Sequence, residues 1–327
     1  MFTPKQIVFA PTGACNLNCS HCRVDRSRGG NGSALTVETA VAFLDQCLAH
    51  EIDRVGFSGG EPFLAIDFLE AVSKASVERG FYFDRLMTNA TWFDDVDTMR
   101  GALQRLYAAG FDGTIAVSFD SYHAAPVEKV LQFIKAVTGI WQRGDCVELV
   151  SVLNRDGTAA VVYIDELAVG LSALVKREGG LPMAIQDQAY LETVRQGLDD
   201  GSGLYIPILL MPYSAAADDP VAWQASRWFK DDYCDGPGNL FFVHPDGAVA
   251  ACCGFGNENP QLIIGTIQDS YERLMASATA NSHIRDCYEK GLGRKRQEME
   301  AAGVKLPGKT DDICFFCDWL CRRGTAE

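Results

Sequence analysis

The sequence predicts an α/β protein with a parallel sheet, followed by a small cysteine-rich α+β region. Through the first two-thirds of the chain, short apolar runs typical of buried strands alternate with segments whose apolar residues recur at helical spacing. After about residue 217 the pattern changes, and Gly, Asp, Asn and Pro become denser. The 12 cysteines of the 327-residue chain are unevenly spread, with close groups near both ends. We therefore expect two domains, residues 1–217 and residues 218–327.

The first domain is predicted to contain about six strand–helix pairs. Thr36 is a candidate N-cap of the first helix, and Gly80 and Gly110 end the second and third. Successive pairs of this kind give right-handed crossovers, and chemistry then lies in the loops after the carboxyl ends of the strands. The predicted strands are residues 7–10, 54–58, 83–88, 114–120, 147–153 and 205–211, and the predicted helices are residues 36–50, 66–79, 95–109, 127–141 and 164–176.

The second domain is predicted to begin with a hairpin. Residues 241–244 and 248–251 read as its strands, and the sequence His-Pro-Asp-Gly between them favours a turn. Short helices are expected at residues 271–278, 282–290 and 294–301.

Composition excludes several classes of protein. The chain carries 29 Lys+Arg against 43 Asp+Glu, a net charge of −14, which argues against broad binding to nucleic acid or anionic membranes. It has no apolar run of about 18 residues, so we expect no membrane span. The N-terminus lacks the basic and apolar regions of a signal peptide. We therefore expect a cytoplasmic protein, in which clustered cysteines more often bind metal than form disulfides.

The first cysteine group is Cys15, Cys19 and Cys22, with spacing C-x3-C-x2-C directly after the first predicted strand. Thiolates so close in sequence can surround one metal centre. A four-iron cube held by three cysteines leaves one iron open to another ligand. The alternatives are a zinc site completed by His21 or by a distant residue, or chance clustering.

This loop resembles the hallmark of the radical S-adenosylmethionine (radical SAM) enzymes. The resemblance implies a partial (β/α)6 barrel in which Cys15, Cys19 and Cys22 hold a [4Fe-4S] cluster. It also implies that the fourth iron binds the amino and carboxylate groups of SAM. One electron would then cleave SAM to methionine and a 5′-deoxyadenosyl radical, which abstracts a substrate hydrogen. His21 stands where many members have an aromatic residue.

Polar motifs follow the next predicted strands. Gly59, Gly60 and Glu61 resemble the family's GGEP motif, which binds the SAM amino group. Two glycines let backbone approach a ligand closely, and a carboxylate suits an ammonium. For each motif the alternative is an ordinary cap or turn residue. Other candidate SAM contacts are Thr88 and Asn89, which resemble a T-N-G segment with Ala90 in the glycine position; Ser118 and Asp120, which resemble an S-x-D segment; and Ser151, Asn154 and Arg155 after the fifth strand, with Arg155 a candidate partner of the SAM carboxylate.

Four residues at the predicted barrel mouth are candidates for contact with substrate. Tyr122 and His123 follow the fourth strand, and Tyr213 and Ser214 follow the last one. Side chains of these types can assist proton transfer. The alternative is that they make ordinary hydrogen bonds at the rim.

The C-terminal cysteines form two separated pairs. Cys252 ends a G-x4-C element after Cys234, and Cys314 and Cys317 form a C-x2-C pair. Four such cysteines can make a closed metal site, and a structural zinc ribbon is the alternative to iron and sulfur. The arrangement resembles the twitch form of the SPASM/twitch extension. This resemblance implies one auxiliary [4Fe-4S] cluster, held by Cys234, Cys252, Cys314 and Cys317.

Five cysteines remain outside these two sets. Cys253 and Cys321 are candidates for donating a hydrogen atom to a substrate radical, with an alternative ligand or a buried thiol as the other interpretations. Cys47, Cys146 and Cys287 fit apolar faces and are predicted to pack as small hydrophobic residues.

The function predicted from this resemblance is radical SAM catalysis on a ribosomally made peptide, by crosslinking, epimerisation or oxidation. The alternative is a dehydrogenase or epimerase of a small polar molecule such as an aminocyclitol or sugar. Because only 14 residues precede Cys15, no leader-recognition domain is expected before the barrel, which weighs toward the alternative. A remote third possibility is a zinc-stabilised scaffold without activity. An electron donor such as flavodoxin or ferredoxin is expected as a partner.

Overall fold

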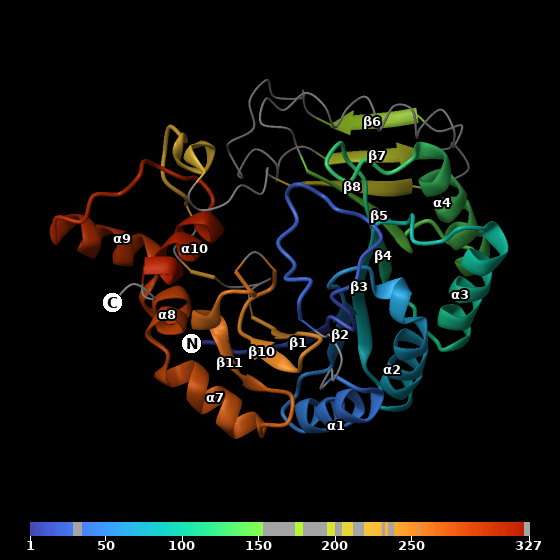
Figure 1. Ribbon diagram of the computed structural model, residues 1–327, viewed down its shortest axis with the longest axis horizontal. Coiled ribbons are helices and arrows are strands. Elements are labelled where there is room, and N and C mark those ends of the chain that lie inside the picture. The colour runs from blue at the N-terminus through green and yellow to red at the C-terminus, as the bar shows by residue number, and fades with distance from the viewer. Residues whose placement is uncertain are drawn as a thin grey trace. The chain divides into compact units, whose positions relative to one another are not determined.

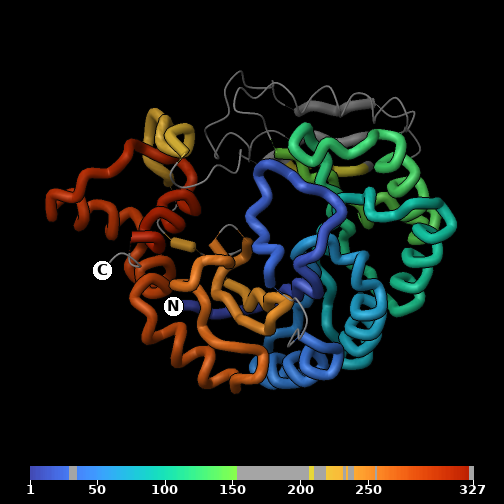
Figure 2. The backbone as a smooth tube through the Cα atoms, in the orientation of Figure 1, coloured from blue at the N-terminus to red at the C-terminus, as the bar shows by residue number. Residues whose placement is uncertain are grey.

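The computed structural model describes residues 1–28, 35–152, 174–178, 195–199, 205–211, 219–230, 233–234, 239–254 and 256–323. The chain, traced in Figures 1 and 2, divides into two compact units. The central unit comprises Pro11–Cys22 and Val55–Tyr213. The terminal unit comprises Met1–Ala10, Arg23–Arg54 and Ser214–Glu327. The predicted domain boundary at residue 217 stays a prediction.

The central unit is built on a largely parallel sheet. Its strand order is β2-β3-β4-β5-β8-β7-β6, and β3, β4, β5 and β8 pair in parallel. Thr88 pairs with Val117 and Ser118 pairs with Val150, so the carboxyl ends of these strands lie at one edge. The strands are β2 (Arg54–Phe57), β3 (Tyr82–Thr88), β4 (Thr114–Ser118), β5 (Val147–Val152), β6 (Leu174–Glu178), β7 (Arg195–Asp199) and β8 (Tyr205–Met211).

In the described part of the central unit, three helices line this sheet. Figure 1 shows α2 (Ile66–Glu78), α3 (Val96–Ala108) and α4 (Val127–Trp141) side by side along the strands, after the short η1 (Pro62–Ala65). Each helix buries apolar residues, and the strands carry fully buried residues such as Leu86 and Ile115. These three helices and strands β3 to β5 lie where the sequence predicted them.

The prediction of a helix over residues 164–176 is wrong at the carboxyl end of that range. Residues 174–176, the last three of the helix predicted over residues 164–176, belong to β6, which pairs antiparallel with β7. Pairing with a strand some twenty residues further on overrides the apolar spacing, since strand formation depends on tertiary partners. Residues 164–173 lie outside the described residues.

Four short strands of the terminal unit pair with one another. β1 (Gln6–Phe9) pairs in parallel with β9 (Phe241–Val243), and β9, β10 (Ala248–Ala250) and β11 (Ile263–Thr266) follow one another antiparallel. The predicted hairpin is confirmed, with Gly247 at φ 83° in its turn. The predicted cap of the first helix is also confirmed, because Thr36 and Thr39 form a reciprocal capping box.

Helices complete the terminal unit. Among them η5 is a π-helical turn, and α10 is a helix that the sequence analysis did not predict. No helix in the described part of the chain is long and apolar enough to cross a membrane. The helical elements are α1 (Val37–Leu48), η2 (Pro220–Trp223), η4 (Pro260–Leu262), α7 (Tyr271–Ala280), α8 (Ser282–Arg285), η5 (Asp286–Lys290), α9 (Leu292–Ala301) and α10 (Ile313–Arg323).

Candidate active site and metal centres

The loop that carries the first three cysteines is seated on the turn after β2, within the central unit. Gly60 N donates to Thr12 O at 2.9 Å, and Glu61 N donates to Ala14 O at 2.8 Å. A Cβ at Gly60 would lie 2.1 Å from Ala14 O, so this contact admits only glycine. The Gly-Gly-Glu sequence is therefore needed for the loop to dock as well as for any ligand.

Glu61 connects the turn to the end of β3. Its Oε1 accepts from Phe63 N at 3.1 Å and from Thr88 Oγ1 at 2.9 Å, and its Oε2 accepts from Asn89 N at 2.8 Å. The side chain is 0% exposed, and this burial raises the pKa of Glu61 to about 7. A carboxylate has about four acceptor positions, so Oε2 retains one for a further donor.

Asn89 links this carboxylate to the cysteine loop. Its Nδ2 donates to Asn16 Oδ1 at 2.8 Å and to Cys15 Sγ at 3.6 Å, and Asn16 Nδ2 donates to Thr91 Oγ1 at 3.1 Å. Leu17 N also donates to Cys15 Sγ, at 3.4 Å. The sulfur of a cysteine that binds a cluster commonly accepts hydrogen bonds of this kind. Asn16 and Thr91 were not predicted from the sequence, because no motif marks them.

The three thiols of the loop have open surroundings. Cys15 and Cys19 are partly exposed and Cys22 is exposed, and Cys22 N donates to Cys19 O at 3.2 Å. Thiols gathered in one short loop and open on one side suit a cluster that keeps one position for another ligand. The donor set therefore fits the cluster that the resemblance implies.

Ala90 adopts a left-handed conformation, with φ 55°. The family's T-N-G segment has glycine here, and glycine adopts this conformation without strain, whereas alanine costs about 1 kcal/mol. The departure from the motif therefore preserves the backbone shape at a small energetic cost.

Asp120 holds together the ends of β4 and β5. Its Oδ1 accepts from His123 Nδ1 at 2.8 Å and from Tyr122 N and His123 N at 2.9 Å, and its Oδ2 accepts from Val152 N at 3.0 Å. Burial opposes ionisation, but the hydrogen bond and charge of His123 hold the pKa of Asp120 below its usual value. Most of its acceptor capacity is therefore used inside the protein.

His21 lies beside this pair. Its ring contacts those of Tyr122 and His123 edge-on, with centroids 5.1 and 4.8 Å apart. Its Nδ1 is buried without a hydrogen-bond partner among the described residues, and burial lowers the pKa of His21. Ligand atoms of His21, Asp120 and His123 lie within 4.8 Å of one another, close enough to share a metal ion or a polar ligand.

Two serines mark the ends of β4 and β5. Ser118 is partly exposed, whereas Ser151 is buried and its Oγ has no hydrogen-bond partner in the described part of the chain. A buried hydroxyl without a partner is costly, so the Ser151 side chain suits a polar ligand. The predicted contacts Asn154, Arg155, Tyr213 and Ser214 lie outside the described residues.

The C-terminal cysteines gather within the terminal unit. Cys314 and Cys317 lie in the first turns of α10, where Asp312 Oδ1 accepts from Cys314 N at 2.7 Å. Cys234, Cys252 and Cys317 lie close enough for their charges to act on Cys314. The four predicted ligands are thus neighbours, and four thiols with no open position suit a closed cluster.

Three further cysteines lie against these four. Cys253 hydrogen-bonds to Cys252 and Cys321 to Cys317, and Cys287 Sγ lies 3.5 Å from Cys317 Sγ. Cys287 is buried as predicted, and in addition its sulfur faces another sulfur. Cys47 and Cys146 are buried as predicted, and burial raises the pKa of both.

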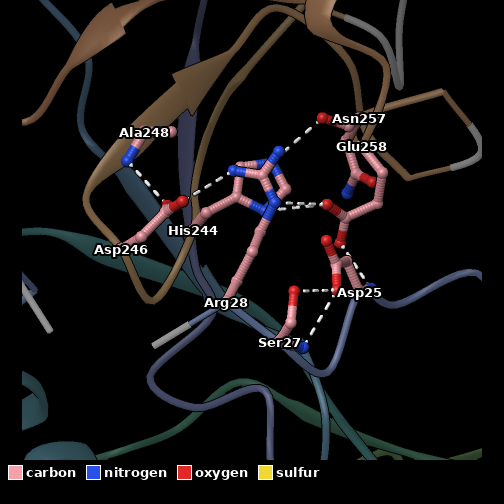
Figure 3. Close-up of polar contacts among 8 residues, drawn as sticks. All are labelled: Asp25, Ser27, Arg28, His244, Asp246, Ala248, Asn257 and Glu258. Carbon is pink, nitrogen blue, oxygen red and sulfur yellow. Dashed lines mark hydrogen bonds and ion pairs between the residues drawn. The ribbon is translucent and has the colours of Figure 1, made fainter. Parts of the chain in front are cut away.

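A second polar network braces the hairpin of the terminal unit (Figure 3). Arg28 pairs with Asp246 Oδ2 at 2.9 Å and with Glu258 Oε2 at 2.7 Å. His244 Nε2 lies 3.0 Å from Asn257 O. Burial, together with the nearby charge of Arg28, lowers the pKa of His244 to about 4. The network ties residues 25–28 to both sides of the segment that carries Cys252 and Cys253.

Comparison with known proteins identifies the family. The family model of the radical SAM superfamily matches residues 9–162, so this part of the chain is a radical SAM domain, as its motifs predicted. Such a domain implies SAM and a [4Fe-4S] cluster as cofactors.

Curated relatives resemble parts of the chain. AdoMet-dependent heme synthase from Methanosarcina barkeri (strain Fusaro / DSM 804) is 29% identical over 38% of this chain and 35% of its own length. PqqA peptide cyclase from Gluconobacter oxydans (strain 621H) is 27% identical over 52% of this chain and 47% of its own. The chain thus spans between about a third and a half of the length of these two relatives.

Among solved structures, Streptococcus suis SuiB bound to precursor peptide SuiA superimposes with a TM-score of 0.57. The match covers 96% of this chain and 76% of SuiB at 13% identity. This likeness confirms the predicted α/β fold with its parallel sheet, and the cysteine-rich C-terminal region is present as predicted.

Proposed function

We propose that the chain is a radical SAM enzyme whose first cluster is held by Cys15, Cys19 and Cys22. The observation that carries the proposal is the docking of an open three-thiol loop onto the turn of Gly60 and Glu61. When bound, the cluster and SAM supply the radical that removes a hydrogen atom from the substrate. The sulfur of Cys15 already receives hydrogen bonds from Leu17 N and Asn89 Nδ2.

The side chains at the carboxyl edge of the sheet take different roles in this proposal. Glu61 offers its remaining acceptor position to the SAM ammonium, beside Gly59 and Gly60. Thr88 and Asn89 hold Glu61 and Cys15 in place. The hydroxyls of Ser118 and Ser151 are available to SAM or substrate. Asp120 acts mainly through its neighbours, since four donors already occupy its carboxylate.

His123 is proposed to move protons at the barrel mouth. Its Nδ1 is held by Asp120 Oδ1 at 2.8 Å, which leaves Nε2 to face a substrate. An imidazole oriented in this way can pass a proton to or from a substrate. Tyr122 lies beside it against His21.

We further propose one auxiliary [4Fe-4S] cluster held by Cys234, Cys252, Cys314 and Cys317. It supplies an acceptor for the electron left on a substrate radical. Of the two spare thiols, Cys253 is the better hydrogen-atom donor, since it is partly exposed whereas Cys321 is 0% exposed.

A ribosomally made peptide is the proposed substrate class. PqqA peptide cyclase is named for a peptide, and SuiB is seen with precursor peptide SuiA. The reaction is a crosslink, an epimerisation or an oxidation. The likeness to a heme synthase keeps a non-peptide substrate as the second candidate.

We also propose a cytoplasmic location and an electron donor such as flavodoxin or ferredoxin, because clustered cysteine ligands need a reducing compartment.

Reductive cleavage of SAM tests this proposal. The protein, prepared without oxygen and reduced with dithionite, should form 5′-deoxyadenosine, and Cys15→Ala should abolish this product. A product that persists in Cys15→Ala would rule out the assignment. Incubation with a candidate precursor peptide should change the mass of that peptide, or introduce deuterium from heavy water if the reaction is an epimerisation. A peptide that stays unchanged while a small polar molecule is converted would support the second candidate.

A further inference from the structure

Cys287 occupies an unusual position among the cysteines of the terminal unit. Its Sγ lies 3.5 Å from Cys317 Sγ, within hydrogen-bond range for sulfur, and its side chain is 3% exposed. Cys234 N donates to Cys287 O at 2.9 Å, so the backbone at Cys287 is also fixed to a second predicted ligand. Cys287 therefore contacts two of the four residues proposed to hold the auxiliary cluster, Cys317 through its thiol and Cys234 through its backbone carbonyl.

The π-helical turn η5 gives Cys287 this position. Gly291 N donates to Asp286 O at 3.0 Å, a bond that spans five residues where an α-helix spans four. The wider turn changes which side chains face the neighbouring helix, and such turns often occur at functional sites.

Two thiols so close cannot bind different irons of one cube, whose cysteine ligands point away from one another. They cannot share one iron either, since each iron takes a single cysteine.

The chemistry of the pair decides which sulfur donates. A cysteine that binds iron is a thiolate and has no proton to give. Once Cys317 is a ligand, only the Cys287 thiol can donate. A hydrogen bond to a ligand sulfur stabilises the more negative, reduced cluster, and the reduction potential of such clusters depends on bonds of this kind.

We propose that Cys287 donates an S–H hydrogen bond to the Cys317 sulfur and thereby raises the reduction potential of the auxiliary cluster. The inference rests on the proposed auxiliary site and adds a residue that controls it. Cys287 is a positioning residue and not a ligand. Because little water reaches it, no solvent donor can replace the bond when the thiol is removed.

A redox titration of the auxiliary cluster alone tests this inference. In a Cys15→Ala/Cys19→Ala/Cys22→Ala parent, only the auxiliary cluster should remain, with about four irons per chain. Adding Cys287→Ala should leave the iron and sulfide content unchanged and shift the midpoint potential, followed by EPR, to more negative values. Cys287→Ser keeps a donor and should recover at least part of the shift. Cys47→Ala removes a buried thiol from α1 of the same unit and should leave the potential unchanged.

Each contrary result has a distinct meaning. Loss of iron in Cys287→Ala would make Cys287 a ligand and overturn the inference. An unchanged potential, or an equal shift in Cys287→Ser and Cys287→Ala, would show that no hydrogen bond acts on the cluster. A parent without iron would contradict the proposed auxiliary site itself, and that failure is visible before any change at Cys287.

Discussion

A single buried carboxylate joins three segments of the central unit. Glu61 receives donors from its own turn, from Thr88 and from Asn89, and Asn89 in turn reaches Cys15. Replacing any one of these partners would leave a buried polar group unsatisfied, at a cost of about 1–3 kcal/mol. The residues proposed to bind SAM are therefore also the residues that fix the cluster loop.

Glu61→Gln should weaken SAM binding by about tenfold or more, because a charge-assisted hydrogen bond of about 1.5–3 kcal/mol is lost. Isothermal titration with SAM in the absence of oxygen measures this change. Glu78→Gln, at an exposed position on α2, is the matched control and should bind SAM as the wild type does. Equal affinity in both variants would exclude Glu61 from the SAM site.

Among the structural elements, the cysteine loop docks on the turn after β2, and this contact positions the three thiols proposed to hold the first cluster. Gly60→Ala would place a Cβ 2.1 Å from Ala14 O, so the cysteine loop must move away from the turn after β2. We predict that this variant retains the fold by circular dichroism but binds less iron at the first site. Gly101→Ala, in α3 with open space around the new Cβ, should leave iron content unchanged and gain up to about 1 kcal/mol in stability. Full iron loading of Gly60→Ala would contradict the docking account.

The hairpin network of Figure 3 makes a second prediction at this scale. The pKa of His244 is about 4 in the folded protein against an ordinary value of 6.5, so the unfolded chain takes up a proton that the folded one does not. Its contribution to stability is present above pH 6.5 and is lost as the pH falls toward 4. Between pH 6.5 and 5 the free energy of unfolding should fall by about 2 kcal/mol from this residue.

Urea unfolding at these two pH values, in the wild type and in His244→Gln, measures this contribution. The variant should lose less stability on acidification than the wild type does. An equal loss in both proteins would show that His244 is not the group that titrates.

At the scale of the whole molecule, the sequence indicated the alternation of strands and helices and the grouping of the cysteines. Strands β3 to β5, helices α1 to α4 and the hairpin carry local signals, such as the Thr36 cap and Gly247. The contact of Asn16 with Asn89 depends on tertiary docking, which no local pattern encodes. The position of Cys287 depends on the π-helical turn, and β6 depends on its distant partner β7.

The central claim is that one chain holds two separate iron–sulfur sites, one in each compact unit. Iron and sulfide content, measured on protein reconstituted without oxygen, tests it most directly. We predict about eight irons per chain in the wild type and about four in Cys15→Ala/Cys19→Ala/Cys22→Ala. We also predict about four in Cys234→Ala/Cys252→Ala/Cys314→Ala/Cys317→Ala. About four irons in the wild type and none after loss of the first three cysteines would contradict the auxiliary site, and a colourless wild-type protein without iron would contradict the whole account.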